Sequence, residues 1–251
     1  MRQSIEASPA KHSPATPRRR VYNHEYVRSL FDRISARYDL LNHLLSAGFD
    51  IRWRKMATAI LKKFQPKRIL DVATGTGDLA IELASIEPEA IIGLDIAPQM
   101  LERGREKVRE KRLEQRIAFE EGTAEEMRFP TGTFDAVTVA FGVRNFSDLS
   151  RGLSEMHRVL KRGGVVLILE FSKPQKPVIK QLYTFYFERI LPVVGGTISG
   201  SPDAYRYLPA TVKEFPMGEE FLSLLRAVGF SSVQQYPLTF GIATIYVGIK
   251  Q

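Results

Sequence analysis

Short apolar runs alternate with helical segments between residues 68 and 170, and this alternation limits the folds open to the chain. The runs are rich in Ile, Val, Leu and Ala, so each predicts a strand that is buried on both faces. Strands separated by helices form βαβ units, which build a parallel sheet covered by helices on both faces. The predicted strands are 68–73, 90–94, 117–120, 134–141 and 165–170, and the predicted helices between them are 79–86, 98–115 and 148–160.

The N-terminal part reads as a basic tail followed by two helices. Residues 1–20 carry five basic residues against one acid, three prolines and no apolar signal-peptide core, so we expect a disordered tail. Apolar residues at three- and four-residue spacing then predict one amphipathic helix over 27–41 and another over 53–64, which Pro66 ends. Residues 21–66 are therefore expected to form a helical cap.

The C-terminal part predicts more helix and then a hairpin. We expect an aromatic helix over 178–191, a loop rich in Gly and Ser over 195–201, and a last helix ending at Gly229. The uncharged run 227–249 has too much polar content for a spanning helix and predicts two strands that break near 239–241, which makes them antiparallel. A mostly parallel sheet that ends in such a hairpin is typical of class I methyltransferases.

Composition excludes several chemistries. The chain has no cysteine, so it has neither disulfides nor thiolate ligands, and its four histidines do not pair at metal-ligand spacing. We therefore expect no metal. The formal charge is +8, but the tail contributes +4 of it, and the charged helix at 102–112 is typical of a solvated face. Composition thus gives no strong nucleic-acid footprint on the folded part.

The sharpest motif is ILDVATGTGDLA at residues 69–80, a predicted strand, a glycine turn and a helix start. Asp95 ends the next predicted strand, 20 residues after Gly75, where an acid can hold the hydroxyls of a ribose. Gly75, Gly77 and Ala80 also fit the spacing of a dinucleotide fingerprint. A nicotinamide cofactor is therefore the first rival interpretation.

Asp71 favours a cofactor without phosphate. A carboxylate beside this loop opposes the pyrophosphate of a dinucleotide, whereas S-adenosylmethionine brings an ammonium and a sulfonium. Thr74 is suited to a turn and can bond the ligand or its own backbone. The alternative for Asp71 is that it only caps the next helix. Thr123 and Ala124 follow the strand at 117–120, where such folds usually contact the adenine.

Five motifs together resemble one family. They are YDLLNHLLS at 38–46 with Trp53 after it, FGVRN at 141–145, RVLKRGG at 158–164, EFSKP at 170–174 and AYRYL at 204–208. In this order they are similar to the demethylmenaquinone/ubiquinone biosynthesis C-methyltransferases (UbiE/MenG), and the resemblance runs from about Val27 to the C-terminus. Two positions depart from the family pattern: Asp50 stands where many members have His, and Arg162 where Pro is usual. We expect both on surface turns.

The resemblance implies the fold and the reaction. The expected fold is α/β, Rossmann-like, with a mostly parallel seven-stranded sheet, an antiparallel C-terminal strand and an N-terminal helical cap, in one methyltransferase domain over 21–251. The implied reaction is S-adenosylmethionine-dependent C-methylation of a polyprenylated quinol, with demethylmenaquinol preferred. A ubiquinone precursor as substrate, alone or in a dual role, stays an alternative. A nicotinamide oxidoreductase and a nucleic-acid-binding module are more remote.

Arg144 and Asn145 are the predicted charge-handling pair, because they follow the strand 134–141 at the carboxyl edge of the sheet. Arg144 can hold a phenolate or polarise a water, and Asn145 can bond the quinol oxygen. The alternative is that Asn145 caps a helix starting at Ser147 and Arg144 is solvated. Tyr38 is assigned to the donor's methionine end, with core packing as its alternative. The full predicted cofactor set is Tyr38, Asp71, Thr74, Gly75, Gly77, Asp95, Ile96, Thr123 and Ala124.

The lipid part of such a substrate needs an apolar trough. We expect residues 175–215 to form a substrate-side helix and loop. Their aromatic residues, together with the helices at the N-terminus of the chain, are expected to line the site of the prenyl tail and to touch the membrane. The alternative is that these residues form a dimer interface or ordinary core. Tyr205, Arg206 and Tyr207 are expected near the substrate mouth. The expected location is cytoplasmic with transient contact at the inner face of the membrane, without nucleic acid, and a homodimer stays open. The residues of this set are the aromatic Tyr183, Phe185, Tyr186 and Phe187 and the aliphatic Ile190.

Overall fold

The computed structural model describes residues 23–39, 43, 46, 48–186 and 202–251. The predicted tail at 1–20, the loop at 195–201 and residues 187–191 of the aromatic helix therefore lie outside the described residues, as do Phe187, Ile190 and the side chains of Tyr183, Tyr205 and Arg206. In the part that is described, no helix has the length and apolar character needed to cross a membrane.

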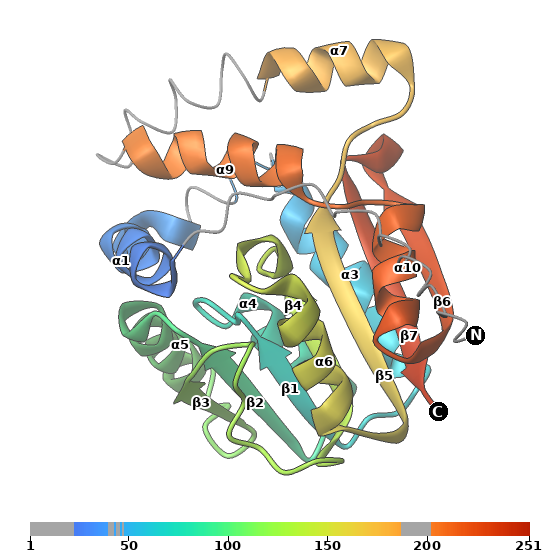
Figure 1. The fold of residues 1–251 in the computed structure, drawn as a ribbon. Coiled ribbons are helices and arrows are strands. Elements are labelled where there is room, and N and C mark those ends of the chain that lie inside the picture. The colour runs from blue at the N-terminus through green and yellow to red at the C-terminus, as the bar shows by residue number, and fades with distance from the viewer. Residues whose placement is uncertain (1–22, 40–42, 44–45, 47, 187–201) are drawn as a thin grey trace, which may run out of the picture.

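One seven-stranded sheet forms the centre of the fold, in the order β3-β2-β1-β4-β5-β7-β6 (Figure 1). The first five strands are parallel, and β7 runs antiparallel to both β5 and β6. The predicted fold class, including the antiparallel end, is confirmed. The strands are β1 (Arg68–Val72), β2 (Ala90–Asp95), β3 (Ile117–Glu121), β4 (Phe134–Ala140), β5 (Leu160–Phe171), β6 (Phe230–Leu238) and β7 (Ala243–Lys250).

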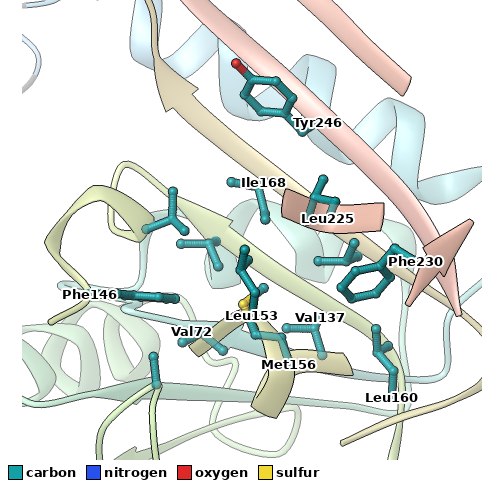
Figure 2. Close-up of a cluster of buried hydrophobic side chains, with 14 of the residues drawn as sticks. Val72, Val137, Phe146, Leu153, Met156, Leu160, Ile168, Leu225, Phe230 and Tyr246 are labelled. Atoms are coloured by element: carbon teal, nitrogen blue, oxygen red, sulfur yellow. The ribbon is translucent and has the colours of Figure 1, made fainter. Parts of the chain in front are cut away.

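Helices cover both faces of this sheet. On one face α3 (Phe49–Lys62), α4 (Asp78–Leu83) and α5 (Pro98–Glu110) bury side chains such as Trp53, Leu61 and Leu83 against β1 and β5. On the other, α6 (Leu149–Val159) and α10 (Glu219–Ala227) supply Leu153, Met156 and Leu225, which Figure 2 shows packed with residues of the central strands. Burying one such side chain contributes about 1.5–3 kcal/mol, so these two layers fix the sheet.

Three helices gather beyond the carboxyl ends of the parallel strands. They are α1 (His24–Ile34), α7 (Pro177–Phe185) and α9 (Pro202–Glu214), and α7 lies outermost (Figure 1). A short 3-10 turn, η1 (Ser35–Arg37), continues α1 towards the loop after β1. Leu30, Met100 and Tyr207 share a small core, which ties α1 to α5 and α9. This arrangement roofs the edge of the sheet where ligands bind in open α/β folds.

Three sequence expectations need correction. The strand at 117–121 is not buried on both faces, because β3 is the edge strand and only Ile117 in it is buried. The helix predicted over 98–115 ends at Glu110, since Arg112 adopts a left-handed backbone conformation (φ 56°). The helix predicted over 79–86 is α4 followed by a single 3-10 turn, η2 (Ala84–Ile86).

Candidate cofactor and substrate site

An open cavity of about 640 Å³ lies at the carboxyl edge of the sheet, between the loops after β1, β2 and β4 and the helix α1. Six of the predicted site residues line it, together with aromatic and aliphatic side chains from α1, α5 and the loop after β4. Those six are Tyr38, Gly75, Asp95, Ile96, Ala124 and Asn145.

The glycine loop after β1 is held in shape by its own hydrogen bonds. Gly75 (φ 57°) takes a backbone conformation that favours glycine, and its N–H donates to the Asp95 carboxylate at 2.8 Å. Gly77 N–H donates to the Thr74 carbonyl, and a Cβ on Gly77 would lie 2.6 Å from the Phe119 ring. Gly77 lines neither of the described cavities at this edge and acts in close helix–strand packing, while Gly75 faces the ligand space.

Asp95 is the carboxylate at the end of β2, where the sequence placed it. Besides Gly75, the N–H of Ala97 donates to it at 2.9 Å, so its side chain is fixed from two sides. Burial raises the pKa of Asp95 to about 6, although the backbone hydrogen bonds from Ala97 and Gly75 lower it in part. A fixed, partly desolvated carboxylate facing a cavity suits hydroxyl groups and positive charge.

Asp71 is fully buried behind the loop. Thr74 Oγ1 and Thr138 Oγ1 donate to its two oxygens at 2.6 and 2.7 Å, and the Ala80 amide in the first turn of α4 adds a third hydrogen bond. Burial raises the pKa of Asp71 to about 6, against those hydrogen bonds. Both interpretations of Asp71 therefore have support, because it accepts from the first turn of a helix and also lines a second cavity. The Thr74 hydroxyl donates its hydrogen bond to Asp71 and not to its own backbone.

That second cavity, of about 380 Å³, adjoins the first and shares Tyr38, Ala73, Gly75, Ala140 and Phe141 with it. A shallower third one lies on the far side of the main cavity, where Thr123 and Ile96 line it with residues of α1. The predicted cofactor residues other than Gly77 thus line these adjoining cavities, from Thr123 to Asp71.

Arg144 lies elsewhere than expected. Its guanidinium donates to Glu170 Oε1 at 2.8 Å and to the Phe141 carbonyl, and it lies 5.6 Å from the Phe171 ring centre. Both members of this ion pair are buried, so the solvated alternative is wrong, and Arg144 lines none of the described cavities. Its catalytic role stays a prediction, and the geometry favours a role in holding the loop after β4.

Asn145 does face the main cavity. Its Oδ1 accepts a hydrogen bond from the Tyr207 hydroxyl at 3.0 Å, which leaves the amide N–H groups to point at a ligand. It caps no helix: α6 begins at Leu149, and its N-cap is Asp148, which accepts from Arg151 N–H at 2.9 Å. Tyr207 is itself buried, at the side of the cavity that α9 covers.

Sequence reasoning missed the polar residues of the second cavity. Arg54, Thr76 and Asp78 line it, and Arg54 is buried by α4 although it belongs to an amphipathic helix rich in surface cations. Asp50 was expected on a surface turn, which is wrong: it is buried in the first turn of α3 and bonds Arg54. Only the i,i+4 spacing of Asp50 and Arg54 signals this pairing. Arg162 is exposed, as expected, but it lies within β5 and not on a turn.

A family model described as the ubiE/COQ5 methyltransferase family matches residues 19–250. The chain is 50% identical over 228 residues to a Geobacter protein named ubiquinone/menaquinone biosynthesis C-methyltransferase UbiE, which covers 90% of this chain and 97% of that one. It is 48% identical over 227 residues to a Bacteroides fragilis demethylmenaquinone methyltransferase, covering 90% and 93%.

Among solved structures, the fold is similar to an S-adenosylmethionine-dependent methyltransferase from Thermotoga maritima described as a possible histamine N-methyltransferase. The TM-score is 0.63 at 19% identity, over 89% of this chain and 99% of that one. At this identity the likeness concerns the fold alone.

Proposed function

The chain belongs to the ubiE/COQ5 methyltransferase family, and we propose that it methylates a ring carbon of a reduced polyprenylated quinol, with demethylmenaquinol as the preferred substrate. The observation that supports this most is identity of 48–50%, over nine tenths of the chain, to relatives named for this reaction. One of those names refers to demethylmenaquinone and the other to the biosynthesis of both ubiquinone and menaquinone, so a dual role stays the alternative.

The residues at the sheet edge fit S-adenosylmethionine better than a dinucleotide. In a dinucleotide site the loop amides receive the pyrophosphate, but here the Gly75 amide already donates to Asp95 and the Gly77 amide to Thr74. Asp95 would hold the ribose, Ile96 and Ala124 would flank the adenine, and Tyr38 and Gly75 would lie at the methionine end. When bound, S-adenosylmethionine supplies an electrophilic methyl group on a sulfonium sulfur.

The quinol ring needs help before its carbon can act as a nucleophile. That carbon becomes nucleophilic as the adjacent hydroxyl ionises, and replacing the ring hydrogen by methyl releases one proton overall. Asn145 donates to the ring oxygen and stabilises developing negative charge there, with Tyr207 fixing the orientation of its amide. Arg144 holds Phe141 and hence the cavity wall. Phe31, Phe141 and Phe146 line the cavity and limit water around the reacting groups.

In this proposal the helices beyond the carboxyl edge of the sheet, α1, α7 and α9, bind the prenyl tail and contact the membrane. Within the predicted cap at 21–66, α1 covers this edge whereas α3 packs on a face of the sheet, and within 175–215 the helices α7 and α9 form the substrate side. Positive charge is crowded there: Lys173 Nζ donates to the Lys213 carbonyl at 3.0 Å, and burial together with the charges of Lys213 and Lys180 lowers its pKa. The exposed Val178 and Phe185 on α7 accompany these lysines, so the region suits transient contact with an anionic membrane surface. A homodimer through the same region is the alternative arrangement.

Substrate preference tests the finer part of the proposal. With demethylmenaquinol and the 2-polyprenyl-6-methoxy-1,4-benzoquinol precursor present in equal amounts, we expect the former to be methylated at a higher kcat/KM. Comparable values for the two would establish the dual role, and a higher value for the benzoquinol would overturn the stated preference.

Cofactor affinity should depend on pH through Asp71 and Asp95. Both pKa values are raised to about 6, so the two carboxylates of the folded protein become protonated as the pH falls through about 6. Aspartates of the unfolded chain become protonated only at a pH of about 3.9. Protonation of the two groups therefore stabilises the folded, ligand-free protein relative to the unfolded chain as the pH falls from about 6 to about 4. This contribution to stability is lost as the pH rises again. Ligand cations need the ionised form, so we expect S-adenosylhomocysteine to bind about tenfold more weakly at pH ~5 than at pH ~7.

Titration calorimetry across this range measures the effect. Asp95→Asn is the matched variant, because it removes one of the two titrating groups and should give a shallower dependence. An affinity that is constant or rises towards low pH would contradict the assignment of these carboxylates to the ligand.

A further inference from the structure

The second cavity carries charges that the predicted site residues leave unexplained. Arg54, Asp71 and Asp78 line it beside Thr76, and it opens onto the main cavity through Tyr38 and Gly75. A ligand whose nucleoside lies beside Asp95 can therefore extend one end into this charged space.

Arg54 is buried with unused donors. Its side chain is 9% exposed, and Nη2 bonds Asp50 at 2.7 Å and lies 3.2 Å from Asp78. Nη1 and Nε, by contrast, have no hydrogen-bond partner among the residues that the structure describes. A guanidinium presents its N–H groups in a planar fork that matches a carboxylate. Arg54 lines the second cavity, so its unused N–H groups could bind a carboxylate there.

The neighbouring acids restrict the ligand further. Asp78 is already paired with Lys107 as well as with Arg54, but a simple anion beside Arg54 would also meet the Asp71 carboxylate, which has no ion pair among the described residues, so a favourable ligand also brings positive charge. An amino acid end satisfies both demands, with its carboxylate at Arg54 and its ammonium at the acids. Asp50, Asp78 and His43 also have the spacing of metal ligands, but Arg54 Nη2 already occupies the space between the two carboxylates.

We propose that Arg54 binds the α-carboxylate of the methionine end of the methyl donor, and that Asp50 positions it. Asp50 holds Arg54 Nη2 on one oxygen, where His43 Nδ1 also lies at 2.8 Å, while Ser46 Oγ donates to the other at 2.5 Å. Burial alone would raise the pKa of Asp50, but the Ser46 hydrogen bond and the charges of Arg54 and His43 hold it below its usual value. Asp50 therefore stays ionised and holds Arg54 Nη2, which leaves Nη1 and Nε for a ligand in the cavity that Arg54 lines.

Three nucleoside probes separate this role from general damage: S-adenosylhomocysteine, its decarboxylated amine, and 5′-methylthioadenosine, which lacks the amino acid end. In Arg54→Gln we expect S-adenosylhomocysteine to bind about 10- to 100-fold more weakly, the range for a lost charged hydrogen bond. The decarboxylated amine and 5′-methylthioadenosine should bind within about twofold of their wild-type values, since neither reaches Arg54 with a carboxylate.

Calorimetry with Arg52→Gln as control completes the test, because Arg52 is an exposed cation on the same helix and should change none of the three affinities. Asp50→Asn should show a smaller loss, also confined to S-adenosylhomocysteine. An equal loss for all three probes in Arg54→Gln, or no loss for any, would overturn the proposal. Failure of the wild-type protein to bind S-adenosylhomocysteine would instead contradict the cofactor itself, whatever Arg54 does.

Discussion

Replacing Glu170 with Gln is expected to lower the free energy of unfolding by about 3–5 kcal/mol, the cost of leaving one buried charge without its partner. Glu170 is completely buried, and its Oε1 accepts from both Arg144 Nη1 and the Phe171 amide, each at 2.8 Å. The Gln side chain keeps the size and one acceptor but removes the charge that balances the guanidinium. Chemical denaturation followed by tryptophan fluorescence reports the change, since Trp53 is the one tryptophan of the chain.

Two further variants make this result specific. Glu102→Gln breaks an exposed pair with Arg105 and should leave stability almost unchanged. Adding Arg144→Met to Glu170→Gln removes both buried charges and should restore part of the lost stability. Arg144→Met alone should lower turnover, because the wall at Phe141 loses its support. A folded double variant that recovers some turnover supports the positioning role, whereas one with none would show that the guanidinium itself acts on the ring.

Asp95→Ala is expected to weaken binding of S-adenosylhomocysteine by about 100-fold. In the proposed site the variant would lose two charge-assisted hydrogen bonds to ribose hydroxyls, and each such bond contributes about 1.5–3 kcal/mol, part of which water replaces. It also frees the Gly75 amide, so the loop loses its internal support. Calorimetry with the purified variant measures the affinity, and a melting curve without ligand checks that the fold is intact.

A matched carboxylate gives the control. Glu89 pairs with Lys67 at the opposite end of β1 and β2, where both side chains are exposed, so Glu89→Ala should bind like the wild type. A loss of less than about threefold in Asp95→Ala would remove this residue from the ribose site.

Much of the fold could be predicted because it rests on local patterns. Uninterrupted apolar runs mark strands that are covered on both faces, and the short break at 239–241 forces an antiparallel pair. The ends of those strands also locate Gly75 and Asp95, since the carboxyl edge of a parallel sheet collects its loops. The exception is β3: its apolar residues predict a buried strand, but β3 lies at the edge of the sheet and is largely exposed.

The charged partners could not be predicted, because pairing depends on packing between distant segments. Arg144 meets Glu170 only when β4 and β5 lie side by side, and nothing local distinguishes this arginine from a solvated one. Arg54 is likewise one of several cations on α3, and only the approach of Asp78 from α4 shows that it is enclosed. Residue type alone therefore could not indicate that Arg144 pairs with Glu170 or that Arg54 is enclosed.

The position of the transferred methyl group tests the central claim most directly. The purified protein is incubated with S-adenosylmethionine carrying a ¹³C-methyl group and with reduced demethylmenaquinone, and the product is analysed by mass spectrometry and NMR. We expect one labelled methyl group per quinone, bonded to a ring carbon, with a chemical shift of an aromatic C-methyl. Label on a ring oxygen, or no transfer while S-adenosylhomocysteine still binds, would contradict the account.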